Sequence, residues 1–288
     1  MPLPDNLKEH LEKSYNIDVQ SESSVSGGSI NSAYCISTSL GDLFLKYNSN
    51  VPQNFFERES DGLKMLRSAN TNLRIPEVIA ADGPDNNRPG FLVMEYIESG
   101  RSGDSEQFGA ELAKLHQTEE SEFGLEDDNY IGSLPQSNRK HSAWESFFSE
   151  ERIKPQLKMA IDSCKMDHSA QKAWGRLSSK LDRLLPKVEP SLIHGDLWSG
   201  NYLFDTNGRA VLIDPAVYYG HPEMDLAFSK MFGGFSSEFY RGYESVSSLE
   251  NGFEERVPIY NLYPLLVHVN LFGGHYVSQA KRVLDRFS

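Results

Sequence analysis

Cysteine is scarce in this chain of 288 residues, which has only Cys35 and Cys164. They form no C-x-x-C pair, and neither lies at zinc-binding spacing from a histidine. A disulfide framework and a structural zinc site are therefore excluded as organising features. We expect both cysteines to behave as small buried hydrophobic residues.

Long apolar segments and an excess of positive charge are also missing. No run approaches the roughly 18 apolar residues of a membrane span, and residues 1–19 lack the apolar core of a signal peptide. The formal net charge is −13 and is spread over both halves of the chain. Such a charge disfavours nucleic acid and anionic membranes as partners. We therefore expect a cytoplasmic protein that binds neither nucleic acid nor membrane.

The most informative segment runs from His194 to Asn201 and has the sequence HGDLWSGN. It contains the pattern H-x-D-x-x-x-x-N, and Asp214 follows 13 residues after the asparagine. This is the spacing of a kinase catalytic loop and its metal-binding aspartate. Asp196 is the candidate base for the attacking hydroxyl. Asn201 and Asp214 offer oxygen ligands suited to Mg²⁺ on the phosphates of ATP.

The residues around this segment predict short strands that position it. Residues 191–193 are expected to enter the loop, and residues 202–204 to leave it. An Asn-Gly turn at residues 206–209 then favours a hairpin with residues 210–213, which carries Asp214 back beside Asn201. An HGD triplet alone also fits an ordinary surface turn. The added asparagine, hairpin and aspartate favour the catalytic interpretation.

The N-terminal part of the chain predicts a five-stranded antiparallel sheet with helices. A helix is expected over residues 7–15. The expected strands cover residues 18–26, 33–38, 43–47, 75–81 and 90–96. Between the first two strands, Gly27, Gly28 and Ser29 form a flexible turn whose amides could approach phosphates. Gly-Gly turns are common in hairpins, and the G-x-x-x-x-G-K-[ST] pattern of a P-loop is absent.

Lys46 lies in an apolar strand, from which it can reach the α- and β-phosphates of ATP. Glu59 shares a helical face with Leu63 and is the expected ion-pair partner that holds this lysine. Glu57 is the competing candidate, although it lies on another face of the helix. A solvated lysine and a surface carboxylate remain the simpler alternative.

Two lobes are predicted, a nucleotide-binding lobe over residues 1–97 and a mainly helical catalytic and substrate lobe over residues 98–288. At their junction, the backbone of Glu95, Tyr96 and Ile97 is expected to bind adenine. His116 is expected to be a structural histidine. In the second lobe, helices are expected near residues 104–116, 143–151 and 173–184, and in a tail broken at Gly273-Gly274. Pro155 is expected to interrupt the helix at residues 143–151.

Four separated segments resemble the fructosamine kinase family, also called the ketosamine 3-kinases. These relatives of aminoglycoside phosphotransferases and choline kinases typically carry the HGDLWSGN form of the loop. The other matching segments are residues 214–227, 147–157 and 262–274. The resemblance extends from about residue 7 to the C-terminus. It implies an α+β, two-lobed protein-kinase-like fold.

The resemblance also implies an activity, namely ATP- and Mg²⁺-dependent phosphorylation of the 3-hydroxyl of ketosamines on glycated amines or glycated proteins. The 3-phosphate destabilises the adduct, so the implied role is deglycation repair. Carried over by position, Lys46 and Glu59 anchor phosphates, Asp196 is the base, and Asn201 and Asp214 bind metal. His194 and Asp225 are expected to support the loop.

Trp198, two residues from the proposed base, is the candidate wall of the sugar site, because an aromatic face suits the apolar side of a ketose. A packing role for this ring is nearly as well supported. One departure concerns the glycine-rich loop, where many eukaryotic members carry a cysteine and this chain has Gly27-Gly28-Ser29. Redox control through such a thiol is therefore not expected.

Two other functions remain open. One is a phosphotransferase of the aminoglycoside or choline type, which the LWSGN residues disfavour. The other is a non-catalytic nucleotide-binding scaffold. That function requires the loss of at least one catalytic group, and Lys46, Asp196, Asn201 and Asp214 are all present. A protein-kinase role is disfavoured because Asp214 is followed by Pro215-Ala216 and no D-F-G or A-P-E segment occurs.

Overall fold

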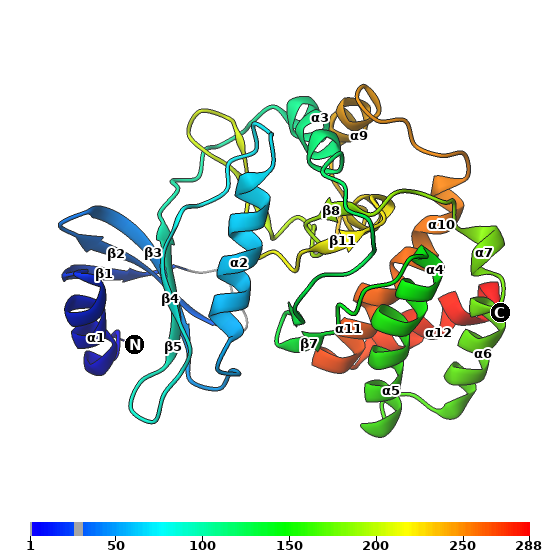
Figure 1. Ribbon diagram of the computed structural model, residues 1–288, viewed down its shortest axis with the longest axis horizontal. Coiled ribbons are helices and arrows are strands. Elements are labelled where there is room, and N and C mark those ends of the chain that lie inside the picture. The colour runs from blue at the N-terminus through cyan, green and yellow to red at the C-terminus, as the bar shows by residue number, and fades with distance from the viewer. Residues whose placement is uncertain (1, 26–30) are drawn as a thin grey trace. The chain divides into compact units, whose positions relative to one another are not determined.

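The computed structural model describes residues 2–25 and 31–288 (Figure 1). The chain forms two compact units. Unit 1 comprises Met1–Ser68, Asn72–Asp104 and Gly200–Pro215, and unit 2 comprises Ala69–Thr71, Ser105–Ser199 and Ala216–Ser288. Unit 1 thus includes a segment from late in the chain. The functional division at residues 97 and 98 stays a prediction.

Unit 1 is built on the predicted five-stranded antiparallel sheet, whose strand order is β1-β2-β3-β5-β4. The strands are β1 (Val19–Ser24), β2 (Ser32–Thr38), β3 (Gly41–Asn48), β4 (Val78–Asp82) and β5 (Gly90–Glu95). This confirms the sheet expected from the apolar patterns. The strand that carries Lys46, β3, has a hydrogen-bonded neighbour on each side, so its backbone is held in register from both edges.

Two helices pack on opposite faces of this sheet, α1 (Asp5–Tyr15) and α2 (Phe55–Ser68) (Figure 1). Leu7 and Leu11 of α1 are fully buried in one core cluster with Leu45 and Val93 of the sheet. Side chains alternate along a strand, so Lys46 points to the face opposite Leu45. That is the face covered by α2.

A late hairpin joins unit 1 through backbone hydrogen bonds. Its strands β9 (Tyr202–Phe204) and β10 (Ala210–Leu212) pair antiparallel, as the Asn-Gly turn predicts. Arg74 donates its amide to Ala210 and accepts from Leu212, at 2.9 and 3.0 Å. Its guanidinium also binds Asp205 at 2.8 Å. These contacts place the end of the hairpin, and therefore Asp214, in the same unit as β3.

Unit 2 is mainly helical, as expected. Its helices are α3 (Ser105–Leu115), α4 (Trp144–Phe147), the π-helix η1 (Phe148–Ile153), α5 (Lys154–Asp162), α6 (His168–Ser178), α7 (Leu181–Leu184), α8 (Glu223–Phe228), α9 (Ser237–Glu244), α10 (Phe253–Tyr260), α11 (Leu262–Phe272) and α12 (His275–Phe287). Its short strands are β6 (Asn129–Ile131), β7 (Leu134–Gln136), β8 (Ser191–Ile193) and β11 (Tyr218–Gly220). The pairs are β6 with β7 and β8 with β11, both antiparallel.

Two details of unit 2 correct the sequence-based expectations. Pro155 does not interrupt the helix, because the chain passes from α4 through η1 directly into α5. A proline removes the hydrogen bond to the carbonyl four residues earlier and crowds that carbonyl. Pro155 lies in the first turn of α5, where this loss is tolerated, and the carbonyl of Glu151 accepts from the guanidinium of Arg152 at 3.2 Å. The expected helix at residues 173–184 is also divided, into α6 and α7.

The cysteines give a third correction, because Cys35 is half-buried and Cys164 is exposed. Cys164 lies just after α5 and has a positive φ of 57°. It therefore belongs to a turn rather than to a packed helix face. Among residues 2–25 and 31–288, no helix combines the length and apolar character needed to cross a bilayer.

Candidate functional site

Unit 1 brings three of the predicted site residues together at the buried amine of Lys46. The side chain of Lys46 is only 6% exposed and forms ion pairs with Glu59 of α2 and Asp214 beyond β10. The distance from Lys46 Nζ to Asp214 Oδ1 is 2.6 Å. Glu57, the competing candidate, is exposed on α2. The lysine therefore pairs with the glutamate that shares the apolar face of the helix.

The electrostatics keep Lys46 positively charged. Burial by itself would lower the pKa of Lys46, but the charges of Asp214 and Glu59 outweigh burial and raise this pKa well above its usual value. Burial raises the pKa of Glu59 to about 7, and the neighbouring ammonium acts in the opposite direction. An ammonium held this way is suited to bind the phosphates of a nucleotide.

Asp214 and Asn201 lie together at the end of the hairpin, because the amide of Ile213 donates to the carbonyl of Asn201 at 3.1 Å. Asn201 is buried, whereas the side chain of Asp214 is 47% exposed. Asp214 has φ of 52°, in the left-handed region that aspartate tolerates better than most residues. Strained backbone of this kind occurs preferentially at functional sites.

These two side chains fit a magnesium ion that is shared with a nucleotide. A carboxylate and an amide are hard oxygen donors, and Mg²⁺ is typically bound by one or two carboxylates together with substrate phosphates and water. Within the described residues, no group of three or more histidine, cysteine or acidic side chains could hold a metal ion. One carboxylate and one amide therefore suit a metal that is bound together with phosphate.

In unit 2, the carboxylate of Asp225 holds the start of the HGD loop. Its oxygens accept hydrogen bonds from the amides of His194 and Gly195, at 2.7 and 2.9 Å. Asp225 is almost fully buried at the start of α8. Two charge-assisted bonds from one carboxylate fix both the position and the direction of the loop backbone.

Gly195 is required by the shape of this loop. It has φ of 80°, and a Cβ atom added there would lie 2.1 Å from the carbonyl oxygen of Ala216. Ala216 in turn donates its amide to the carbonyl of His194 at 2.9 Å. The amide of Asp196 donates to the Nδ1 atom of His194 at 3.2 Å. The histidine thus supports the loop, and the side chain of Asp196 is half-buried.

His116, the residue that follows α3, completes the buried hydrogen-bond network around Asp225. Its Nε2 lies 3.2 Å from Asp225, and its Nδ1 lies 2.8 Å from the hydroxyl of Tyr243. A histidine enclosed between these partners orients the aspartate and is fully buried itself. This agrees with the structural role expected for His116.

Trp198 belongs to an aromatic cluster in unit 2 that sequence patterns did not reveal. Its ring meets the ring of Phe232 edge-on at 5.8 Å. The centre of the Phe232 ring also lies 5.1 Å from that of His268 and 6.5 Å from that of Tyr276. Phe232 is 41% exposed and has φ of 53°. The Gly233-Gly234 pair beside it was the available signal, because it marks an irregular segment next to an aromatic residue.

The remaining predicted residues fall into two groups. Gly27, Gly28 and Ser29 lie outside the described residues. Glu95 lies at the end of β5, where its amide donates to Glu77 and its carboxylate binds Arg74. Tyr96 is exposed and Ile97 half-buried in the segment that follows. The side chain of Glu95 therefore has a structural partner, and only backbone groups of this segment remain candidates for adenine.

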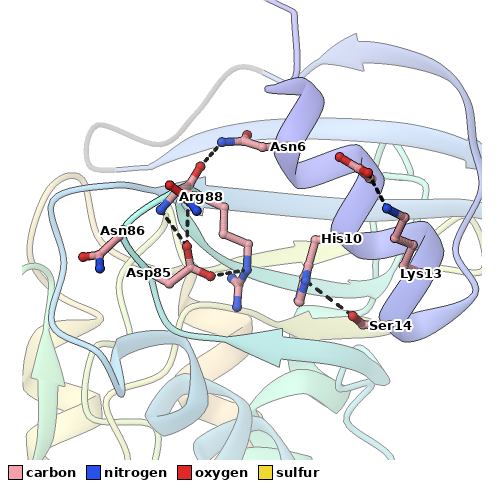
Figure 2. Close-up of a pocket in the computed structure, with 9 residues that line it drawn as sticks. Asn6, His10, Lys13, Ser14, Asp85, Asn86 and Arg88 are labelled. Carbon is pink, nitrogen blue, oxygen red and sulfur yellow. Dashed lines mark hydrogen bonds and ion pairs between the residues drawn. The ribbon is translucent and has the colours of Figure 1, made fainter.

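A separate cavity of about 530 Å³ in unit 1 is lined by residues from α1 and the β4–β5 connection (Figure 2). Its charged groups are matched internally. Lys13 pairs with Glu9, and Arg88 pairs with Asp85. None of the predicted site residues lines this cavity.

The fold is shared with known phosphotransferases. An aminoglycoside phosphotransferase APH(4)-Ia, solved in a ternary complex with AMP-PNP and hygromycin B, superposes with a TM-score of 0.62. It is 16% identical, and the alignment covers 97% of this chain and 98% of that one. Together with the five-stranded sheet and the helical unit, this defines the class as a protein-kinase-like phosphotransferase fold.

Sequence comparison identifies the family within that class. Residues 3–288 match the family model described as fructosamine kinase. A probable ketoamine kinase of Enterococcus faecium is 40% identical over 265 residues, covering 91% of this chain and 94% of that protein. The chloroplastic protein-ribulosamine 3-kinase of Oryza sativa subsp. indica is 39% identical, covering 92% of this chain and 78% of that protein.

A solved structure agrees with this assignment. A Thermobifida fusca protein, described as a candidate fructosamine-3-kinase, is 30% identical and superposes with a TM-score of 0.85 over 98% of this chain and 99% of that one. The chain therefore belongs to the fructosamine kinase family, and it is a kinase.

Proposed function

We propose that this kinase transfers the γ-phosphate of ATP to the 3-hydroxyl of ketosamines, the adducts of amines with reducing sugars. The observation that carries this proposal is the pairing of the buried amine of Lys46 with Glu59 and Asp214, in a chain whose HGD loop is held by Asp225. The names of the relatives support the acceptor class, since they include a ketoamine kinase and a protein-ribulosamine 3-kinase.

Unit 1 supplies the nucleotide side of the reaction. Lys46 binds the phosphates, and Glu59 holds its ammonium in place from α2. The backbone of residues 95–97 is the proposed contact for adenine. Gly27, Gly28 and Ser29, which lie outside the described residues, are proposed to contact phosphate. Asn201 and Asp214 would hold Mg²⁺. A bound Mg²⁺ supplies positive charge that offsets the charge developing on the phosphate oxygens.

Asp196 in unit 2 carries out the proton transfer. Its carboxylate accepts the proton of the sugar hydroxyl as the hydroxyl oxygen bonds to the γ-phosphorus, and the bond from that phosphorus to the ADP oxygen breaks. Proton transfer of this kind typically contributes about 10²- to 10⁴-fold in rate. The two bonds from Asp225 to the loop amides keep Asp196 in position, which limits the cost of aligning the reactants.

The aromatic cluster of Trp198 and Phe232 is the proposed binding surface for the sugar that receives the phosphate. The ring of Trp198 is half-buried and lies two residues from Asp196. An aromatic face of this kind can cover the apolar face of a ketose. Phe232 packs against the edge of this ring and restricts its orientation, so the packing role and the sugar-binding role are compatible.

A ketosamine carrying a 3-phosphate breaks down more readily than its precursor, and its breakdown releases the amine. We therefore propose a role in the repair of glycated amines or glycated proteins. The class of acceptor is tested by measuring ADP release with ribulosyl-, erythrulosyl- and fructosyl-lysine, in parallel with aminoglycosides and choline. Turnover confined to ketosamines supports the proposal. Turnover confined to aminoglycosides or choline contradicts it.

A further inference from the structure

Arg152 is the largest of the fully buried side chains, with no exposed surface, and it lies in the π-helix η1. Removing a guanidinium from water costs several kcal/mol, and proteins usually offset this with a carboxylate. The nearby carboxylate of Glu151 is engaged elsewhere, by Ser137, Arg139 and His141. A buried cation held in this way calls for an explanation beyond packing.

The contacts of Arg152 among the described residues are with neutral groups. Its Nη1 donates to the carbonyls of Ser137 and Glu151, and its Nη2 donates to Asn138 Oδ1 at 2.7 Å. The guanidinium carbon lies 3.8 Å from the centre of the Tyr218 ring. Its Nε has no hydrogen-bond partner in the described part of the chain. The charge is therefore met by rings and amide dipoles.

The stacked ring of Tyr218 leads directly to the HGD loop. Tyr218 in β11 pairs with Ile193 in β8, the strand that enters the loop. A Cβ atom added to Gly195 would lie 3.2 Å from Cε1 of Tyr218. The guanidinium therefore lies over the face of this ring, and the Cε1 atom of the ring lies close to Gly195, the residue before Asp196.

A chain of hydrogen-bonded amides forms a second route from Arg152 to the loop. Asn138, which accepts from Arg152, donates to Asn129 at 2.9 Å, and Asn129 donates to the carbonyl of Val217 at 2.8 Å. Ala216, the residue before Val217, donates to the carbonyl of His194. Each amide is oriented by the one before it, and such chains strengthen cooperatively.

The charges of Arg152 and Asp196 both act on the pKa of Tyr263 in α11. Its hydroxyl donates to Gln136 at 2.7 Å, and Gln136 donates to the carbonyl of Ala216 at 3.1 Å. Burial raises the pKa of this hydroxyl, the Arg152 charge acts against that shift, and the Asp196 charge adds to it. The two charges thus act on the same buried group behind the loop.

We propose that Arg152 is a positioning residue for the phosphotransfer reaction, which holds Gly195 and Asp196 in place through the ring of Tyr218 and the amides of Asn138 and Asn129. This inference rests on the proposed function, because it takes Asp196 as the base. Arg152 lies in the π-helix η1, and its guanidinium also donates to the carbonyl of Glu151 at 3.2 Å.

The test compares Arg152→Lys and Arg152→Met with Leu177→Ala, which truncates a fully buried residue of α6 in the same unit and should be strongly destabilising. Lysine keeps the charge but lacks the planar fork that stacks and donates simultaneously. We expect kcat to fall about tenfold in Arg152→Lys and about 10²-fold in Arg152→Met, the scale of loss from a misplaced reacting group. KM for ATP should stay within about twofold, because unit 1 carries the nucleotide contacts.

Hydrogen exchange at the amides of residues 194–198 provides a readout that does not depend on turnover. We expect faster exchange there in both Arg152 variants than in Leu177→Ala, with similar exchange elsewhere in unit 2. If Arg152→Met does not fold, Arg152→Lys and Tyr218→Leu carry the test, and Tyr218→Leu should reproduce the loss of kcat.

The inference is overturned if the Arg152 variants match Leu177→Ala in both kcat and loop exchange. The proposed function can fail separately. If the unmodified protein transfers no phosphate to any ketosamine while the loop amides still exchange faster in Arg152→Lys, the positioning role stands and the assigned reaction does not.

Discussion

The ammonium of Lys46 donates to the carboxylate of Asp214 at 2.6 Å, although 168 residues separate them in the sequence. This contact joins the strand lysine that we assign to the phosphates and the aspartate that we assign to magnesium. Arg74 makes it possible, because its backbone bonds to the hairpin bring residues 200–215 into unit 1. The nucleotide side of the site is therefore assembled within one compact unit.

Glu59 should matter for ATP use and Glu57 should not. Glu59→Gln removes the buried charge beside Lys46, and we expect kcat/KM for ATP to fall about tenfold, equivalent to roughly 1.4 kcal/mol. Glu57→Gln is the matched control, because it makes the same chemical change on the exposed face of α2. Steady-state kinetics with varied ATP check this expectation. Equal effects of the two variants would argue against the assigned ion pair.

Asp196→Asn should separate nucleotide binding from chemistry. The amide cannot accept the hydroxyl proton, so we expect transfer to fall by at least about 10²-fold. Binding of Mg²⁺-ATP, measured by calorimetry, should stay close to that of the unmodified protein. Asp182→Asn, an exposed change on α7 in the same unit, serves as the control. Unchanged turnover in Asp196→Asn would refute the role of this residue.

The sequence offers candidates for the site residues through local patterns. Spacing singled out Asp196, Asn201 and Asp214, because catalytic loops require fixed separations along the chain, and their catalytic roles stay predictions. The helical face separated Glu59 from Glu57 for the same local reason. The five strands and the Asn-Gly hairpin were likewise local patterns, and the structure confirms them.

The rest depended on contacts between distant segments. The binding of Arg74 to the hairpin and the cluster of Trp198 with Phe232 leave no periodic signal in the sequence. The expectation for Pro155 was wrong, because Pro155 lies in the first turn of α5, where a proline is tolerated, directly after the π-helix. The sequence patterns did not single out Arg152, and only the structure shows its guanidinium over the ring of Tyr218.

Gly195 should tolerate no side chain. Gly195→Ala forces a Cβ atom against the carbonyl of Ala216 at a positive φ, so we expect destabilisation by roughly 2 kcal/mol or more and loss of turnover. In contrast, a Cβ atom on Gly175 in α6 meets open space. Gly175→Ala should therefore be neutral or stabilising by about 0.5–1 kcal/mol. Denaturant unfolding of both variants checks this, and equal stabilities would contradict the loop geometry.

His221 should make stability depend on pH. Burial, with the nearby charge of Arg256, lowers the pKa of His221 from 6.5 to about 3. Its Nδ1 accepts from the amide of Glu223 at 3.1 Å, which fits a neutral ring. The unfolded chain takes up a proton below pH 6.5 and the folded chain does not. The stabilising contribution is therefore complete above pH 6.5 and is lost as the pH falls toward 3.

Urea unfolding between pH 4.5 and 7.5 measures this dependence. We expect His221→Asn to remove roughly 2–3 kcal/mol of the change in unfolding free energy between pH 6.5 and 4.5. His168→Asn, an exposed change on α6, should leave the pH dependence as it is in the unmodified protein. A His221→Asn profile parallel to that of the unmodified protein would show that this histidine does not titrate as described.

Mass spectrometry of the acceptor tests the central claim most directly. Ribulosyl- and fructosyl-lysine are incubated with ATP, Mg²⁺ and either the unmodified protein or Asp196→Asn, and the products are fragmented to locate any phosphate. The account predicts that at least one ketosamine gains the mass of one HPO₃ group at its third sugar carbon, with the unmodified protein only. No gain on any ketosamine, or a phosphate at another position, would contradict it.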